Sequence, residues 1–228
     1  MEPERLFASM DAALLDMDGT ILDDMDEWRQ CNVDYLEQRG IELTPEQRLR
    51  VVNSSSGALL IDYVRDVLGI EVDIPAFRTL QQDRMMAVYE KGPPVKAGAR
   101  EFLDALRGHG VKVVLATATW PEHTIVALNK CRLVHCFDAI CCSHMMGCGK
   151  NNPDYFKKVS DLIGVPKERC VLFDDAMYAL KGGRDAGILG NVAVEDPMNT
   201  LFRTEMAALS DTMVDSLADL IPFLRQPV

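Results

Sequence analysis

The sequence predicts an α/β fold with a parallel sheet and a block of helices inserted after the first strand. From residue 99 onward, apolar runs of strand length alternate with helical patterns, which is typical of βαβ units with right-handed crossovers. One earlier apolar run, 12–15, precedes a stretch at 23–91 that shows helical patterns alone. We therefore expect an α/β domain formed by 1–22 and 92–228, and an α-helical domain at 23–91.

The first strand ends in two acidic residues. Residues 1–11 are expected to lead into a buried strand at 12–15, because four apolar residues there are followed by a polar exit. Residues i and i+2 of an extended chain point to the same side, so Asp16 and Asp18 can share a site. In open α/β sheets ligands bind at this end of the strands. Two acids solvated before a turn are the alternative for this motif.

The inserted block is expected to contain four helices. Apolar residues from 28 to 36 have helical spacing, and Gly40 is a typical helix stop. Thr44 resembles an N-cap, because proline follows it and Gln47 completes a capping box. That helix ends at the polar stretch 53–57. The remaining two helices are expected at 58–68 and 74–89.

The alternating part of the chain supplies the other elements of the sheet domain. Strands are expected at 111–116, 137–142, 170–173 and 188–194. Helices are expected at 99–106, 121–130, 153–163, 176–185 and 217–224.

Composition argues against several classes of partner. The chain has 228 residues, 48 % of them hydrophobic, and a formal net charge of -11 without a cluster of basic residues. Nucleic acids and anionic membranes both require a basic face, so we expect neither as a partner. The acidic N-terminus is followed by no long apolar run, so we expect no signal peptide and no membrane span. These features predict a cytoplasmic protein, either a monomer or a weak homodimer.

The seven cysteines are expected to be free thiols. Their number is odd and no Cys-x-x-Cys pair occurs. A zinc site is the alternative for a cluster near the middle of the chain, but its spacing matches no common zinc pattern. That cluster consists of Cys136, Cys141, Cys142, His144 and Cys148.

Polar residues also follow other strands of the predicted sheet. Thr117 and Ala118 follow one strand, the Asp174-Asp175 pair follows another, and Lys150 lies in a loop between them. Four carboxylates at one edge repel one another unless a cation lies among them, and oxygen ligands favour Mg²⁺. A lysine and a hydroxyl beside Mg²⁺ suit a phosphate group. Taken singly, Thr117 can simply end a strand, Lys150 can be solvated, and an aspartate can cap the next helix.

Taken together, these motifs resemble the haloacid dehalogenase superfamily, in particular the subgroup that contains β-phosphoglucomutase and phosphoglycolate phosphatase. The stretch from Asp16 to Thr20 is similar to the first family motif, Thr117 to the second, Lys150 to the third, and Asp174-Asp175 to the fourth. The block at 23–91 lies where this family inserts its α-helical cap. The resemblance implies a Rossmann-like core, a Mg²⁺ cofactor and a small phosphorylated metabolite as substrate.

The family mechanism implies a role for each matching residue. Asp16 would be the nucleophile that forms an aspartyl-phosphate, and Asp18 would be the general acid and base. Thr117, Ala118 and Lys150 would bind the phosphoryl oxygens, with Thr117 and Lys150 counted as catalytic. The metal ligands would be Asp16, Asp174, Asp175 and the backbone carbonyl of Asp18. The resemblance therefore implies a phosphatase, with a sugar phosphomutase or a catalytically silent phosphometabolite-binding domain as alternatives.

The chain departs from its relatives in the expected cap. Trp28 and Asp24 stand where β-phosphoglucomutase has a hinge His and a hinge Thr, and the loop 53–56 lacks that mutase's Arg. These differences favour hydrolysis over mutase chemistry. No lysine near Gly57 matches the Schiff-base lysine of phosphonate hydrolases. Smaller departures from the family pattern are Ala176 and the Asn151-Asn152 pair.

Several side chains are candidates for contact with the substrate, namely Asn53, Ser54, Ser55, Arg84 and Trp120.

Overall fold

Six parallel strands form the sheet of this computed structural model, which describes residues 3–52, 57–196, 199 and 202–224. The strand order is β3-β2-β1-β4-β5-β6, and every neighbouring pair runs parallel. This order confirms the predicted α/β class with a Rossmann-like sheet. The strands are β1 Ala12–Leu15, β2 Lys112–Thr117, β3 Ala139–Cys142, β4 Cys170–Asp174, β5 Gly190–Val194 and β6 Thr212–Val214.

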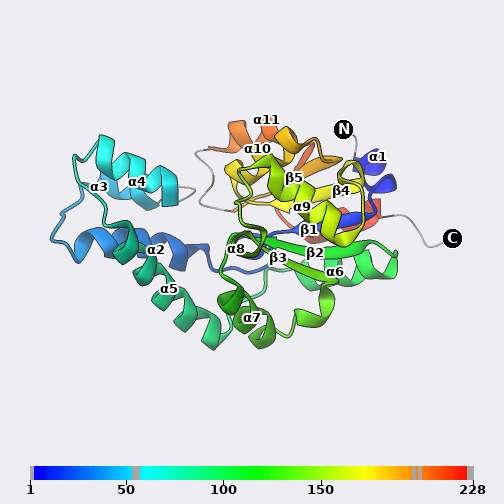
Figure 1. Cartoon of the computed structure of the whole chain (residues 1–228), viewed down its shortest axis with the longest axis horizontal. Helices are drawn as coiled ribbons and strands as arrows, with labels where there is room; N and C mark the ends of the chain where they lie inside the picture. The colour runs from blue at the N-terminus through cyan, green and yellow to red at the C-terminus, as the bar shows by residue number, and fades with distance from the viewer. Residues whose placement is uncertain (1–2, 53–56, 197–198, 200–201, 225–228) are drawn as a thin grey trace.

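The central strand β1 is apolar on both faces because helices cover both sides of the sheet. Leu15 packs in one hydrophobic cluster with α1 Pro3–Ala8, α6 Ala99–Gly108 and α7 Pro121–Lys130. Its neighbour Leu14 faces the other cluster, which includes residues of α9, α10 and α11. Figure 1 shows α10 and α11 on one side of the sheet and α6 and α7 on the other. The bounds on that first side are α9 Pro153–Ile163, α10 Met177–Ala186 and α11 Arg203–Leu209.

Between β1 and α6, the described residues form four helices that extend to one side of the sheet (Figure 1). They have a hydrophobic cluster of their own, which includes Tyr35, Val51 and Phe77. The last helix, α5, joins this cluster to the sheet: Phe77 near its start packs there, whereas Tyr89 near its end packs in the cluster that contains Leu15. The division at 23–91 stays a prediction. The helices are α2 Met25–Glu37, α3 Pro45–Val52, α4 Gly57–Asp66 and α5 Ile74–Lys91.

Several segments differ from the sequence prediction. The expected N-terminal leader contains helix α1, which buries Leu6 and Phe7; the Phe7 ring lies 6.1 Å from that of Phe173. The expected last helix is a 3₁₀ helix, η4 Leu217–Phe223, with a proline inside it. Strand β6 and helices α8 Ser143–Met146 and α11 were not predicted, since such short segments show little periodicity. Within the described ranges, every helix falls short of the length and apolarity that crossing a bilayer requires.

Candidate active site

The candidate site lies at the C-terminal ends of three adjacent central strands. Asp16 directly follows β1, Thr117 ends β2 and Asp174 ends β4. The backbone N–H of Asp16 donates to the carbonyl of Phe173 at 2.9 Å, which extends the β1–β4 pairing as far as the first acid. The parallel register therefore brings these three residues to one edge of the sheet, as the sequence predicted.

A tight turn after β1 carries the chain away from this edge. Gly19 has φ +76°, a conformation that glycine adopts without strain, and its N–H donates to the carbonyl of Leu22 at 2.9 Å. A Cβ atom at this position would lie only 2.4 Å from Asp175 Oδ2. Glycine is thus required here both by the turn and by the close approach of an acidic side chain.

Lys150 is completely buried among the acids. Its Nζ lies 2.8 Å from Oδ2 of Asp16 and 2.7 Å from Oδ2 of Asp174. Burial alone would lower the pKa of Lys150, but the charges of these two carboxylates raise it well above its ordinary value. The side chain is therefore a fixed ammonium. Helix α10 packs closely on this loop, since a Cβ at Gly182 would lie 1.9 Å from the Lys150 carbonyl oxygen.

Three buried carboxylates form a candidate metal centre. Oxygens of Asp16, Asp174 and Asp175 all lie within 4.8 Å of one another. Burial raises the pKa of Asp16 well above its ordinary value despite the opposing charge of Lys150, and no described residue donates a hydrogen bond to its Oδ1. Burial and the charge of Asp174 raise the pKa of Asp175 to about 7. An all-oxygen set with excess negative charge fits a hard divalent cation such as Mg²⁺.

Magnesium binding at these carboxylates should weaken as the pH falls. A protonated Asp175 must lose its proton before it binds a cation, and its pKa is raised to about 7. Displacement of one such proton makes the apparent Kd for Mg²⁺ about tenfold higher at pH 6 than at pH 8. Isothermal titration calorimetry in buffers of different ionisation enthalpy measures both the Kd and the protons released. Binding that is independent of pH, without proton release, would contradict this expectation.

Asp18 has different hydrogen-bond partners from Asp16, although its charge is close enough to contribute to the raised pKa of Asp16. Its Oδ1 accepts a hydrogen bond from the Tyr89 hydroxyl at 2.7 Å, and its Oδ2 accepts one from Thr119 Oγ1 at 2.5 Å. A carboxyl group can accept both hydrogen bonds when it is ionised, and it keeps acceptor capacity when it carries a proton. Burial raises the pKa of Tyr89 well above its ordinary value, and the charge of Asp18 adds to this, so the hydroxyl keeps its proton.

The loop after β2 places one buried and one exposed residue near the acids. Thr117 is fully buried, and its Oγ1 accepts a hydrogen bond from the backbone N–H of Thr119 at 3.0 Å. Its hydroxyl hydrogen can still be donated to a bound ligand. Ala118, the predicted third binder of phosphoryl oxygens, is exposed.

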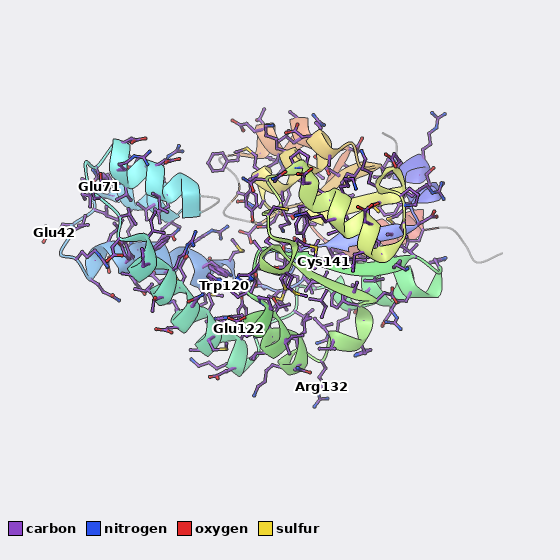
Figure 2. The ribbon with its side chains drawn as sticks, viewed as in Figure 1. Glu42, Glu71, Trp120, Glu122, Arg132 and Cys141 are labelled. Atoms are coloured by element: carbon purple, nitrogen blue, oxygen red, sulfur yellow. The ribbon has the colours of Figure 1, made fainter. Side chains whose placement is uncertain are left out.

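The first turn of α2 also borders the site. Burial raises the pKa of Asp24 well above its ordinary value, and the neighbouring charge of Asp18 raises it further. Trp28, one turn later, stacks on Trp120 with ring centroids 6.2 Å apart. Figure 2 shows Trp120 where the inserted helices meet the sheet domain. Trp120 thus packs between the two parts of the chain.

Of the other candidates for substrate contact, Arg84 has acidic partners. Arg84 forms ion pairs with Glu27, at 2.8 Å, and with Asp34, so acidic residues of α2 hold its guanidinium. Asn53, Ser54 and Ser55 fall outside the described residues.

Sequence reasoning missed three groups around the acids. Tyr89 and Thr119 bind Asp18, and Lys96 Nζ donates to the Gly19 carbonyl at 2.5 Å. Thr119 could have been found from its place two residues after Thr117. Neither Tyr89 nor Lys96 lies in a motif, because their contacts depend on how distant elements pack.

Comparison with known proteins identifies the class. A family model described as haloacid dehalogenase-like hydrolase matches residues 10–187, so the chain belongs to this family. The chain is also 23 % identical over 179 residues to the phosphorylated carbohydrates phosphatase of Thermotoga maritima. The aligned stretch covers 78 % of this chain and 82 % of that protein. The predicted hydrolase class is thereby confirmed, and this relative supports a phosphatase.

Solved structures agree with the fold. A variant of CbbY from Rhodobacter sphaeroides, in complex with xylulose 1,5-bisphosphate, superposes with a TM-score of 0.76 at 21 % identity, covering 95 % of this chain and 100 % of that one. A putative β-phosphoglucomutase from Thermotoga maritima has a TM-score of 0.68 at 21 % identity, covering 94 % of this chain and 98 % of that one. The predicted fold, which this family shares, is thereby confirmed.

Proposed function

We propose that this chain is a Mg²⁺-dependent phosphatase that hydrolyses a small, sugar-like phosphorylated metabolite through an aspartyl-phosphate. The observation that carries the proposal is the arrangement around Asp16. One carboxylate oxygen lies 2.8 Å from the buried Lys150 ammonium, and the other receives no hydrogen bond from a described residue. A carboxylate that is anchored at one oxygen and has no hydrogen-bond donor at the other suits a nucleophile.

The first step transfers the phosphoryl group to the enzyme. Asp16 attacks phosphorus, the bond from phosphorus to the leaving oxygen breaks, and protonated Asp18 gives that oxygen its proton. Lys150 and the Thr117 hydroxyl bind phosphoryl oxygens, and Ala118 would assist through its backbone. Lys150 also offsets the negative charge that four nearby carboxylates impose on an anionic substrate.

The second step returns the enzyme to its starting state. Asp18, now ionised, takes a proton from water as the water oxygen attacks phosphorus. The bond from phosphorus to Asp16 breaks, and inorganic phosphate leaves with Asp18 protonated for the next cycle.

The metal would be held by carboxylate oxygens of Asp16, Asp174 and Asp175, with the backbone carbonyl of Asp18 as a further ligand. When bound, Mg²⁺ supplies positive charge that stabilises the negative phosphoryl oxygens in the transition state. The raised pKa values of Asp16 and Asp175 support this assignment: burial is the main cause of both, and the neighbouring carboxylates raise them further.

The proposed substrate class draws on the relatives. The phosphorylated carbohydrates phosphatase is named for sugar-like substrates, and the CbbY variant holds a sugar bisphosphate. A panel of phosphorylated sugars, nucleotides and small acids, assayed for phosphate release with Mg²⁺ and with EDTA, tests the function directly. Phosphate release that requires Mg²⁺ supports the proposal. A panel without turnover favours the silent binding domain, and turnover unaffected by EDTA contradicts the metal site.

Hydrolysis, rather than mutase chemistry, is the expected fate of the intermediate. A mutase must exclude water from its aspartyl-phosphate while the sugar reorients. This chain has Trp28 and Asp24 at the positions where β-phosphoglucomutase has its hinge His and hinge Thr. With β-glucose 1-phosphate, Mg²⁺ and a trace of glucose 1,6-bisphosphate, we expect free phosphate to exceed glucose 6-phosphate. Enzymatic assay of both products measures the ratio. Rapid formation of glucose 6-phosphate with little free phosphate would establish a mutase instead.

A further inference from the structure

The general acid and base Asp18 is held from two sides. Thr119, in the loop after β2, donates to Oδ2 at 2.5 Å, and Tyr89, at the end of α5, donates to Oδ1 at 2.7 Å. Together the two hydroxyls bind both oxygens of the carboxylate, which restricts its rotation about the Cβ–Cγ bond. No family motif identified in this sequence includes Tyr89.

The Tyr89 hydroxyl has a fixed position of its own. The side chain is fully buried, and its ring meets that of His123 edge-on, with centroids 6.1 Å apart and an interplanar angle of 85°. His123 is fixed in turn, because its Nε2 lies 2.9 Å from the Gln82 carbonyl oxygen on α5. Tyr89 is therefore a rigid donor rather than a mobile side chain that happens to reach the acid.

Tyr89 also connects Asp18 to the inserted helices. Helix α5 begins among those helices, where Phe77 packs in their hydrophobic cluster, and it ends with Tyr89 in the cluster that contains Leu15 of β1. The bond between Tyr89 and Asp18 spans 71 positions in the sequence. A single continuous helix therefore links the packing of the inserted block to the orientation of the catalytic acid.

We propose that Tyr89 is a positioning residue that orients Asp18 for proton transfer, so that the inserted block contributes to the chemical step. The proposal rests on the proposed phosphatase function. Proton transfer is fast only when the acid lies within hydrogen-bond reach of the leaving oxygen, and a small displacement of a reacting group costs much of the rate. A carboxylate held by Thr119 alone can rotate out of that geometry.

The matched variants are Tyr89→Phe and Tyr35→Phe, which each delete one buried, hydrogen-bonded hydroxyl. The Tyr35 hydroxyl accepts from the backbone N–H of Asp73 at 2.8 Å and donates to the carbonyl of the same residue at 3.3 Å, so Tyr35→Phe controls for the loss of a hydrogen-bonded hydroxyl on a buried side chain. Thr119→Val removes the other donor to Asp18 and supplies a second test if Tyr89→Phe is poorly folded. Thermal unfolding of each variant reports its structural effect.

The leaving group separates positioning from a structural role. A sugar phosphate needs a proton on its leaving oxygen, whereas p-nitrophenolate departs without one. For a sugar phosphate that the wild type hydrolyses, we expect Tyr89→Phe to lower kcat about tenfold to a hundredfold with KM unchanged. With enzyme in excess, its first-turnover release of p-nitrophenolate should equal that of the wild type. Tyr35→Phe should match the wild type with both substrates.

Two results would overturn the proposal. One is a Tyr89→Phe variant whose kcat on the sugar phosphate equals that of Tyr35→Phe, or whose rate falls by the same factor with the sugar phosphate and with p-nitrophenyl phosphate. The other is unimpaired turnover of the sugar phosphate by folded Thr119→Val and Tyr89→Phe together in one chain. A wild-type protein inactive towards both substrates with Mg²⁺ would instead refute the phosphatase function on which the proposal rests.

Discussion

Replacement of Asp16 by asparagine is expected to abolish turnover while preserving the fold. The amide is nearly isosteric with the carboxylate, but it cannot form an acyl phosphate, so no intermediate can arise. The burial that raises the pKa of Asp16 means that its ionised form destabilises the folded protein at pH values above the unfolded pKa. A neutral amide removes this cost, so the variant should unfold at no lower temperature than the wild type.

The measurement combines phosphate release with thermal unfolding. Asp161→Asn is a matched control, because Asp161 is an exposed aspartate paired with Lys157 and lies on the surface of α9. The control should keep full activity. A folded Asp16→Asn protein that still releases phosphate at the wild-type rate would exclude Asp16 as the nucleophile and, with it, the proposed mechanism.

The part of the site that could be predicted from sequence is the part that the sheet itself assembles. Asp16, Thr117 and Asp174 each follow or end an apolar run, and parallel pairing brings such positions to one edge regardless of the rest of the fold. Lys150 was predicted to join them, and it does so with both oxygen contacts under 3 Å, at 2.7 and 2.8 Å. Strand periodicity is local, so it can be read from one sequence.

The contacts of Asp18 could not be predicted in this way. The alternation rule placed Asp16 and Asp18 on one side, but the turn at Gly19 and the approach of α5 give Asp18 its own partners. Tyr89 lies in a helix whose apolar residues are divided between two hydrophobic clusters, so its sequence pattern does not reveal which surface it faces. The angle at which a helix crosses its neighbours depends on the packing of elements that are distant in the sequence, which no local period encodes.

The same distinction explains the elements that were missed. Helix α1 was expected to be a leader because it spans only 6 residues; it is stabilised by the contact of Phe7 with Phe173 and Phe223. An isolated helix of that length is unstable in water, so tertiary packing, and not propensity, determines its presence.

Replacement of Asp18 by asparagine is expected to lower kcat by about 10²- to 10⁴-fold, the usual contribution of general acid and base catalysis. Asparagine can accept a hydrogen bond from one of the two hydroxyls through its amide oxygen and donate to the other hydroxyl oxygen through its NH₂ group. It can neither protonate the leaving oxygen nor accept a proton from water. Both halves of the cycle should therefore slow when the substrate has a poor leaving group. The nucleophile stays intact, because Asp16 keeps its own contact with Lys150 at 2.8 Å.

A substrate with an activated leaving group should separate nucleophilic attack by Asp16 from proton transfer by Asp18. With p-nitrophenyl phosphate, Asp18→Asn should release a first equivalent of p-nitrophenolate and then stop, because the aspartyl-phosphate forms without acid catalysis but hydrolyses slowly without a base. Rapid-quench measurements would follow the release of p-nitrophenolate, and the amount of acid-stable phosphoenzyme would be measured in the same quenched samples. Phosphoenzyme that accumulates in Asp18→Asn and is absent from Asp16→Asn assigns the two carboxylates their separate roles. Equal steady-state rates for Asp18→Asn and the wild type would remove Asp18 from the mechanism, and Tyr89 would then have no proton donor to orient.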